Sequence, residues 1–350
     1  MEKITIIGAG AMGSALTTPL IENGNEVRLW GTELDGHIID ELRKGNNHPK
    51  HKYPLLKEAK LFKVDELEQA MEGSRYVIMA ITSDALGMIF DRVVPYLKED
   101  SIVATVSKGF DYDKEGEIVI LPEILKEKLP NDLKSIPIVA VGGPCKANEV
   151  LYRSPTCVVY ASEDMAASKK FKELIATEVY NVKTDGDIIG TEICAAMKNA
   201  YAVSLGMAEG YKGIKGLTHN NTKSALFTIA TEEMDLFATA MGGSAKSVYG
   251  LPGSGDLEVT GEAGRNRILG EVVGEGMKSS MAIQKMQDED ITVEGYPAIK
   301  FGYNLVKNLD EKGKIDIKRL PLLTALYEIL YQDAPCYETI QKVLNDYCNS

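Results

Sequence analysis

The sequence lacks the features that would remove it from the ordinary class of globular proteins. It has only five cysteines in 350 residues, scattered and without a C-x-x-C pair, which fits free thiols in a reducing cytoplasm. An excess of positive charge is also missing. The formal net charge is −12, which argues against non-specific binding to nucleic acid or to an anionic membrane. We therefore expect a folded protein with no nucleic-acid partner and no stable membrane association.

Histidine is scarce, and nothing resembles a secretory signal. The four histidines, His37, His48, His51 and His219, lie in polar segments without cysteine or acidic partners at metal-ligand spacing. We therefore predict that all four lie at the surface and that there is no metal site. The first residues predict a strand rather than a charged region followed by a cleavage site, so we expect a cytoplasmic location.

One long apolar run is present, Ile188 to Met207, but charge interrupts it. Lys198 stands in its middle, and a lysine at the centre of a bilayer costs roughly 3 kcal/mol. A buried helix of a soluble domain is the better interpretation. A buried lysine is itself costly unless it is paired or used. Positions three and four residues away offer no carboxylate, so its partner must come from elsewhere. The alternative is a salt-bridged or snorkelling lysine at the edge of a core helix.

The start of the chain carries a glycine-rich turn in a specific context. The β-branched segment Lys3 to Ile7 predicts a buried strand, and a helix start follows the turn. Within the turn, Gly8 permits a tight bend, Gly10 lets the backbone approach a pyrophosphate, and Gly13 allows close helix packing. The helix N-terminus offers unpaired N–H groups to phosphates. A strand, G-x-G-x-x-G and a helix in this order predict dinucleotide binding.

The residues after the second strand bear on the choice of cofactor. An acidic residue about 20 positions beyond the glycines can bind ribose hydroxyls, and Glu33 stands there. No arginine directly follows the strand to hold a 2′-phosphate, although Thr32 can contact one. We therefore expect NAD or NADP, with a modest preference for NAD. Alternatively, Glu33 only caps the next helix.

Buried strands and helices continue to alternate, which predicts an α/β domain with a Rossmann-like sheet. The further strands are expected at Ala59–Val64, Tyr76–Ile81, Ser101–Val106, Ile136–Val141, Thr156–Tyr160 and Tyr180–Val182. Ligands of open α/β sheets bind beyond the carboxyl ends of strands, where Lys108 and Gly143 lie. Lys108 is suited to bind an anion or carbonyl group, unless it is a solvated loop lysine.

A predicted hinge at Lys183 to Asp187 divides the chain into two predicted domains. Residues 1–185 form the NAD(P)-binding Rossmann domain, and residues 186–350 form an all-α, substrate-binding and catalytic domain. Glycine-rich turns separate the helices of the second part, one of which is expected at Asn221–Met241. Arg265, Asn266 and Arg267 at a helix start combine donors with the helix dipole and predict a phosphate site. Surface arginines are the alternative.

In this order, the motifs resemble the NAD(P)-dependent glycerol-3-phosphate dehydrogenase family over essentially the whole chain. The matching elements are Gly8 to Gly13, Ser107-Lys108-Gly109, Gly143-Pro144 with Ala147 and Glu149, Lys198-Asn199, Gly250-Leu251 through Gly255-Asp256-Leu257, Arg265-Asn266-Arg267 with Gly270, and Val293-Glu294-Gly295. The resemblance implies reversible reduction of dihydroxyacetone phosphate, a small phosphorylated substrate, to sn-glycerol 3-phosphate. We expect a homodimer, although the sequence itself does not fix the oligomeric state.

The resemblance also implies roles for individual residues. Lys198 is expected to be the general acid and base, with Lys108 and Asp256 completing the catalytic set. The same three are expected to bind substrate, together with Gly143, Arg265 and Asn266. The expected cofactor contacts are Gly8, Gly10, Ala11, Met12, Gly13, Thr32, Glu33, Lys108, Ala147, Arg265, Val293 and Glu294.

Two alternatives stay open at this point. Cys145 and Gly264 replace hydroxyl side chains of the family pattern, which allows a dehydrogenase of the same architecture for another small polyol phosphate or hydroxy acid. A non-catalytic NAD(P)-sensing protein is the alternative of another class. It would need the loss of Lys198, Lys108 or Asp256, and all three are present.

Overall fold

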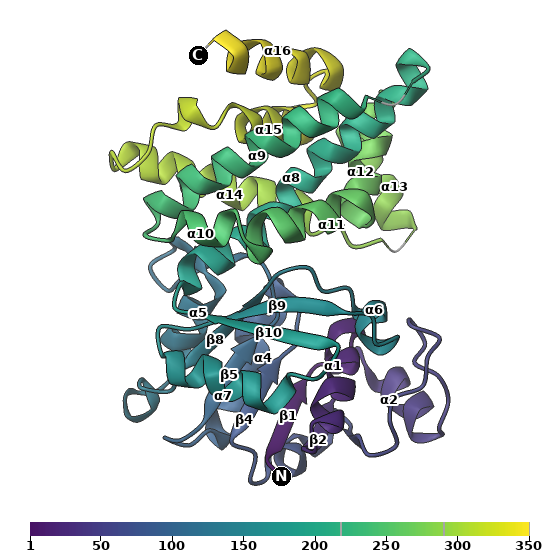
Figure 1. The fold of residues 1–350 in the computed structure, drawn as a ribbon, viewed down its shortest axis with the longest axis vertical. Helices are drawn as coiled ribbons and strands as arrows, with labels where there is room; N and C mark the ends of the chain where they lie inside the picture. The colour runs from purple at the N-terminus through teal and green to yellow at the C-terminus, as the bar shows by residue number, and fades with distance from the viewer. Residues whose placement is uncertain (218, 290, 350) are drawn as a thin grey trace. The chain divides into compact units, whose positions relative to one another are not determined.

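The chain folds into two compact units, described here from a computed structural model. The structure describes residues 1–217, 219–289 and 291–349. Unit 1 is Met1–Ile188 and unit 2 is Ile189–Ser350, so the boundary falls at the first turn of helix α8 (Ile188–Lys215). Figure 1 shows a sheet with helices in the first unit and helices in the second.

Unit 1 is built on an eight-stranded sheet with the order β10-β9-β8-β5-β4-β1-β2-β3. Its strands are β1 (Lys3–Ile7), β2 (Glu26–Trp30), β3 (Lys60–Phe62), β4 (Tyr76–Met79), β5 (Ile102–Thr105), β8 (Ile138–Gly142), β9 (Thr156–Ala161) and β10 (Tyr180–Asp185). Neighbouring strands are parallel except β8 and β9, which pair antiparallel. The chain reverses its direction of travel across the sheet between β1 and β4, and such a switch point is where doubly wound sheets bind ligands.

Helices cover both faces of this sheet, which explains why its central strands are almost wholly apolar. Alternate residues of β1 and β4 point to opposite faces, so Ile6 and Ile78 join one core while Ile7 and Met79 join the other. The helices of unit 1 are α1 (Ala11–Glu22), α2 (Gly36–Arg43), α3 (Leu67–Met71), α4 (Ser83–Val93), α5 (Leu121–Lys128), α6 (Ala147–Leu151) and α7 (Met165–Ile175). Side chains of α1 and α7 fill the first core, and those of α3, α4 and α5 fill the second.

Two details of unit 1 differ from expectation. Strand β10 runs to Asp185, so the first half of the predicted hinge is strand, because its residues continue the pairing with β9 as far as Ala161. The segment after β5 forms a hairpin of β6 (Phe110–Tyr112) and β7 (Ile118–Ile120), which the sequence analysis did not anticipate. Three-residue strands are too short to give a clear alternation of polar and apolar residues.

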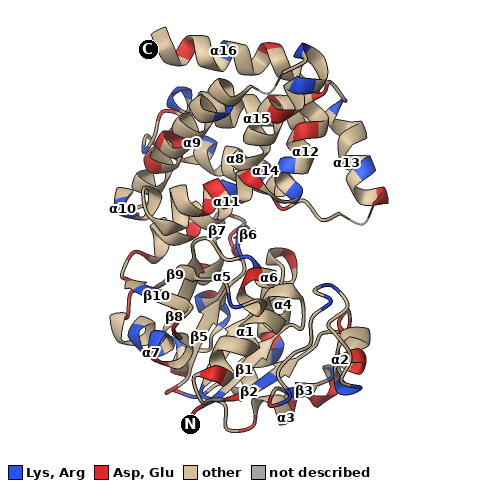
Figure 2. Cartoon of the chain, turned by 45° about the vertical axis from the view of Figure 1, so that its right-hand side comes forward, with Lys and Arg blue, Asp and Glu red and all other residues tan. Residues whose placement is uncertain are grey.

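Unit 2 consists of helices in every regular element that the structure describes. After α8 these are α9 (Asn220–Ala240), α10 (Ala245–Val248), α11 (Asp256–Glu262), α12 (Arg265–Gly274), α13 (Ser279–Asp288), α14 (Gly295–Glu311), α15 (Pro321–Gln332) and α16 (Cys336–Asn349). Acidic and basic residues are interspersed along helices of both units (Figure 2). No helix within the described residues is both long and apolar enough to cross a bilayer. The predicted fold class, a Rossmann-like α/β domain followed by an all-α domain, is confirmed.

Helices α8 and α12 touch through glycines, and this contact lets their backbones approach closely. A Cβ added to Gly206 would lie 2.1 Å from the carbonyl oxygen of Arg267, and one added to Gly270 would lie 2.0 Å from that of Val203. Gly210 and Gly274 repeat this pattern one turn further along. Any side chain at these positions would push the helices apart. Lys198 and the start of α12 are therefore held at a distance set by backbone contact.

A buried carboxylate joins α9 to the start of α15. Glu233 is only 2% exposed, and its oxygens accept N–H bonds from Leu322 at 2.5 Å and Leu323 at 2.9 Å. The hydroxyl of Tyr201 donates a third bond at 2.9 Å. These bonds satisfy N–H groups at a helix N-terminus that have no partner within the helix. Burial nevertheless raises the pKa of the Glu233 carboxyl to about 8.

We predict that Gly270→Ala destabilises the protein by about 1–3 kcal/mol, the usual cost of overpacking a tight contact. The added methyl group has no space against the backbone of α8. Gly213→Ala on α8 is the matched control, because there a Cβ would meet only the flexible side chain of Glu275, at 3.2 Å. Urea unfolding monitored by circular dichroism would measure both. Equal stability of the two variants would contradict the backbone contact.

The raised pKa of Glu233 predicts a pH dependence of stability. Between pH 4.5 and about 8 the folded protein holds a proton that the unfolded chain releases, so stability falls as pH rises through this window. The slope contributed by this group is at most about 1.4 kcal/mol per pH unit. Glu233→Gln should remove that contribution, whereas Glu328→Gln, at an exposed site of α15, should keep it. Parallel slopes of urea midpoint against pH for both variants would contradict the assignment.

Candidate active site

The glycine turn after β1 has the shape that a dinucleotide requires. A Cβ on Gly8 would lie 2.5 Å from the carbonyl oxygen of Ala80, and one on Gly13 would lie 2.0 Å from that of Gly8. A Cβ on Gly10 would meet none of the described atoms within 4 Å. Gly10 is also the N-cap of α1, and no described side chain caps this helix end. The first N–H groups of α1 thus have no capping side chain among the described residues, which fits a pyrophosphate at this helix end.

A carboxylate that follows β2, Asp35, meets this turn. Asp35 Oδ2 accepts the N–H of Ala9 at 3.1 Å, together with the N–H and the hydroxyl of Thr32 at 3.0 and 2.9 Å. Glu33 instead forms an ion pair with Arg92 at 2.7 Å, with 60% of its side chain exposed. Asp35 lies only two positions beyond Glu33 and was not predicted from the sequence.

The prediction that every histidine lies at the surface is wrong for His48. Its side chain is fully buried, and Nε2 lies 3.2 Å from the carbonyl oxygen of Ala9. His51 is partly buried, with Nε2 2.9 Å from the carbonyl oxygen of Ala11. Both rings therefore pack on the glycine turn, in a segment whose polar composition predicts exposure. His37 is exposed, as expected.

The predicted strand-end residues follow β5 and β8 in unit 1. Lys108 is half-buried two residues after Val106, beside Ser107, whose hydroxyl donates to the carbonyl oxygen of Ile81 at 2.5 Å. Gly143 is buried directly after β8, with a positive φ of 108°. Parallel pairing of β4, β5 and β8 brings these ends to one edge of the sheet.

Residues after Gly143 pack towards the glycine turn. Ala147 begins α6, which packs against α1. The sulfur of Cys145 lies 4.0 Å from the sulfur of Met12 and 4.0 Å from the hydroxyl of Tyr180. Cys145, a departure from the family pattern, is thus in contact with Met12, a predicted cofactor contact.

In unit 2, Lys198 lies in a buried polar group. It is 6% exposed, and its ammonium donates to Asp256 Oδ1 at 2.5 Å and to Thr260 Oγ1 at 2.9 Å. Asp256 is 1% exposed, so both charges are shielded from water. The carboxylate partner does come from elsewhere in the chain, as the absence of one on α8 required. Thr260 was not identified from the sequence. It lies one turn after Asp256 on α11, a spacing that places both on one face.

The neighbouring residue, Asn199, belongs to a second polar group. Its amide donates to Glu294 Oε2 at 3.1 Å, and its oxygen accepts a bond from Asn266 at 2.9 Å. Asn266 Oδ1 in turn accepts the N–H of Gly295 at 2.8 Å. Arg265 lies 3.4 Å from Glu294 and keeps 53% of its side chain exposed. Five residues, each a predicted ligand or next to one, are thus joined where α8, α12 and α14 meet.

The start of α12 differs in part from the predicted phosphate site. Arg267 is paired with Glu209 at 2.5 Å and Glu271 at 2.7 Å, so it helps to hold α12 to α8. Gly264 precedes the helix with a positive φ of 145°, a conformation that a serine would adopt only under strain. The glycine there is therefore required by the backbone. Donors that can still meet an anion are the N–H groups of the first turn and the guanidinium of Arg265.

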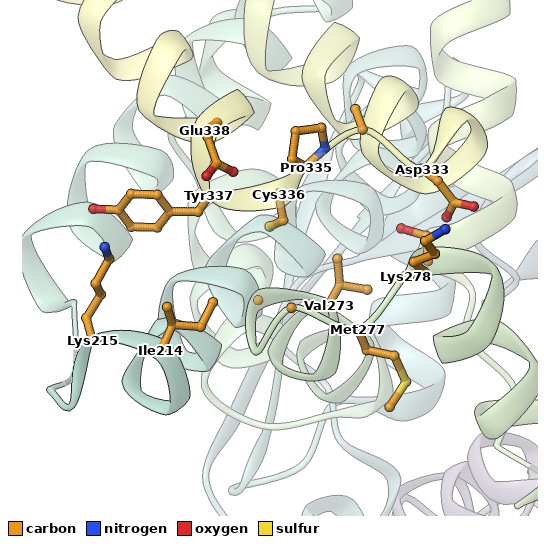
Figure 3. A pocket seen from close by; sticks show the side chains of 14 residues that line it. Ile214, Lys215, Val273, Met277, Lys278, Asp333, Pro335, Cys336, Tyr337 and Glu338 are labelled. Carbon is orange, nitrogen blue, oxygen red and sulfur yellow. The ribbon is translucent and has the colours of Figure 1, made fainter.

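Two cavities of unit 2 lie outside the Lys198 group. One, of about 230 Å³, is bordered by the end of α8, the α12–α13 turn and the α15–α16 turn (Figure 3). Its lysines, Lys215 and Lys278, lie at opposite sides and do not converge on a common point. The other, of about 340 Å³, is largely apolar and includes Val293 and Tyr296. Val293 is one of the predicted cofactor contacts.

Comparison with known proteins covers both units. Residues 3–168 match the family described as NAD-dependent glycerol-3-phosphate dehydrogenase N-terminus, and residues 187–341 match its C-terminus. The NADP(+)-dependent glycerol-3-phosphate dehydrogenase of Archaeoglobus fulgidus is 36% identical over 338 residues, covering 96% of this chain and 97% of that protein. A glycerol-3-phosphate dehydrogenase [NAD(P)+] of Clostridium botulinum is 32% identical over 334 residues, covering 95% of this chain and 94% of the relative.

A solved structure gives the same result. The crystal structure of glycerol-3-phosphate dehydrogenase from Coxiella burnetii superimposes with a TM-score of 0.82 at 28% identity, covering 98% of each chain. Both halves of the chain thus match the same family in sequence, and the full length matches it in fold. The resemblance found in the motifs is confirmed: this chain belongs to the NAD-dependent glycerol-3-phosphate dehydrogenase family.

Proposed function

We propose that this protein is an NAD(P)-dependent glycerol-3-phosphate dehydrogenase that reversibly reduces dihydroxyacetone phosphate to sn-glycerol 3-phosphate. The observation that supports it most directly is the buried ammonium of Lys198, held by Asp256 and Thr260. A charge is costly to bury, and an acid–base role gives it a use beyond structure. Both units match the same dehydrogenase family, and unit 1 carries a glycine turn with open space at Gly10.

We assign the cofactor to the glycine turn and the residues predicted with it. The phosphates would meet the N–H groups from Gly10 to Gly13, and the ribose would lie near Thr32 and Glu33. When bound, the nicotinamide supplies or accepts the hydride. The remaining proposed contacts are Gly8, Lys108, Ala147, Arg265, Val293 and Glu294. Two carboxylates after β2, Glu33 and Asp35, would repel a 2′-phosphate, which supports a modest preference for NAD. Arg92 offsets part of this repulsion through its pair with Glu33.

Lys198 is the proposed general acid and base. As hydride reaches the carbonyl carbon, negative charge develops on its oxygen, which the ammonium stabilises and then protonates. In the oxidative direction the neutral amine takes the hydroxyl proton. Asp256 and Thr260 orient the amine through the two bonds that they accept. Because both come from one face of α11, they fix the position of Nζ relative to that helix.

The substrate phosphate is proposed to bind at the start of α12. Arg265 has an exposed guanidinium there, and the helix N-terminus adds N–H groups and a positive dipole end. Asn266 uses its side chain to join Asn199 to Gly295, so we propose that it serves the substrate through its backbone N–H as well as by holding this junction. Lys108 and Gly143 are further proposed substrate ligands from unit 1.

We also propose that the protein works in the cytoplasm as a homodimer. No disulfide occurs among the described residues, and reduced thiols suit that compartment. The dimer rests on the family resemblance, and light scattering of the purified protein would test it.

The central experiment is a spectrophotometric assay with dihydroxyacetone phosphate, run separately with NADH and NADPH. We expect oxidation of both, faster at low concentration with NADH. Oxidation of neither, with cofactor binding retained, would redirect the assignment to other polyol phosphates or hydroxy acids.

We predict that Lys198→Ala lowers kcat by about 10²–10⁴-fold, the usual contribution of a positioned acid–base group. Cofactor affinity, measured by fluorescence titration, should stay nearly unchanged. Lys223→Ala is the matched control, because Lys223 is another ion-paired lysine of unit 2, with Glu209 and Glu262 as its partners. A Lys198→Ala protein with near-normal turnover would exclude the assigned role.

We predict that Arg265→Ala raises KM for dihydroxyacetone phosphate by about 10- to 100-fold, since a hydrogen bond to a charged group contributes about 1.5–3 kcal/mol. Arg267→Ala is the control on the same helix turn. Because Arg267 pairs with Glu209 and Glu271, its loss should lower the melting temperature and leave KM nearly unchanged. An unchanged KM in Arg265→Ala would remove this arginine from the phosphate site.

A further inference from the structure

The segment 44–53, named here the histidine segment, lies against the glycine turn through two imidazole rings. His48 is fully buried, and Nε2 lies 3.2 Å from the carbonyl oxygen of Ala9. His51 reaches the carbonyl oxygen of Ala11 at 2.9 Å. The ring centroids are 4.7 Å apart, so the two side chains also support each other.

The hydrogen bonds around His48 define one neutral tautomer. Nδ1 accepts the backbone N–H groups of Lys50 at 3.1 Å and His51 at 3.4 Å. An imidazole nitrogen that accepts carries no proton, so the proton is on Nε2. Nε2 therefore donates to the carbonyl oxygen of Ala9. The ring joins the histidine segment to the glycine turn, and in this form both of its nitrogens have hydrogen-bond partners.

The peptide groups of Ala9 are held from two further directions, which makes this residue the fixed point of the turn. Its carbonyl oxygen also accepts the hydroxyl of Ser14 at 3.0 Å, and its N–H donates to Asp35 at 3.1 Å. These partners come from α1 and from the turn after β2. Gly8 and Gly10 lack side chains that could fix them, so the contacts at Ala9 determine where the next N–H groups point.

We propose that His48 is a positioning residue for the dinucleotide. It holds the carbonyl group of Ala9 inward so that the N–H groups at the start of α1 face the pyrophosphate, and His51 does the same at Ala11. This inference rests on the proposed dinucleotide-binding function but concerns residues outside the expected contact set. Neither histidine takes part in hydride or proton transfer.

The role carries a pH dependence with a definite sign. Burial lowers the pKa of His48 from its ordinary 6.5, and among the described residues His51 and Lys50 lower it further while Asp35 and the bond to Ala9 oppose this. A second proton would have to occupy Nδ1, which faces two N–H donors. The neutral, loop-holding form is thus complete above pH 6.5 and is lost as pH falls through the lowered pKa. Cofactor affinity should fall on the acid side.

The test compares His48→Ala and His48→Gln by fluorescence titration with NADH and with NADPH. His48→Ala should raise the Kd about tenfold at neutral pH, the equivalent of one net hydrogen bond, while kcat at saturating cofactor changes little. His48→Gln retains an amide donor and acceptor and cannot titrate. It should bind nearly as the wild type above pH 6.5 and should lack the loss of affinity that the wild type shows as pH falls through the lowered pKa of His48. His37→Ala, at the exposed histidine of α2, is the control and should behave as the wild type.

The possible results separate this proposal from the proposed function. A wild-type protein that binds neither NADH nor NADPH would overturn both. Binding by the wild type, with an unchanged Kd in folded His48→Ala, would overturn the positioning role alone. So would an acid-side loss of affinity in His48→Gln equal to that of the wild type. A raised Kd in His48→Ala with recovery in His48→Gln would support the proposal.

Discussion

The buried charge of Lys198 is the constraint on which much of unit 2 depends. An ammonium group removed from water costs several kcal/mol unless an opposite charge and further acceptors replace its hydration. Asp256 supplies that charge and Thr260 the second acceptor, and both lie on α11. Helix α11 must therefore dock against α8 at one place and in one rotation. The same bonds leave the amine in a fixed position, as an acid–base group requires.

A second constraint acts on the other side of α8, where packing replaces charge. The glycines of α8 and α12 bring the two backbones into contact, and Gly295 places the start of α14 beside Asn199 in the same way. Successive residues of a helix point about 100° apart. Lys198 can therefore face α11 while Asn199 faces α12 and α14. One turn of α8 thus organises the proposed proton donor and the proposed phosphate site together.

The sequence predicted those parts of the site that follow from local pattern. The strand, glycine turn and helix lie where periodicity placed them, and the cost of burying Lys198 required a distant carboxylate. That this carboxylate is Asp256, 58 residues along the chain, follows only from the family resemblance and the fold. His48 was misjudged because Pro49, Lys50 and Lys52 around it suggest solvent. Its burial arises from contact with Ala9, 39 residues away, which no local pattern reveals. The bond between Asp35 and the N–H of Ala9 was not predicted, because it depends on the geometry of the turn after β2 and not on a local pattern.

Glycine has opposite effects in the two units: it allows close backbone contact in unit 2 and leaves open space in unit 1. Between α8 and α12, the glycines let backbone pack directly on backbone, and this contact sets the distance between the helices. In the turn after β1 it creates space at Gly10, and a turn without side chains cannot hold its own shape. The orientation must then be imposed from outside, by Asp35, Ser14 and the buried ring of His48. These contacts leave the first N–H groups of α1 open towards an anion rather than capped. A phosphate bound at the start of α1 would give these uncapped N–H groups a partner. Binding of the dinucleotide should therefore stabilise the folded protein.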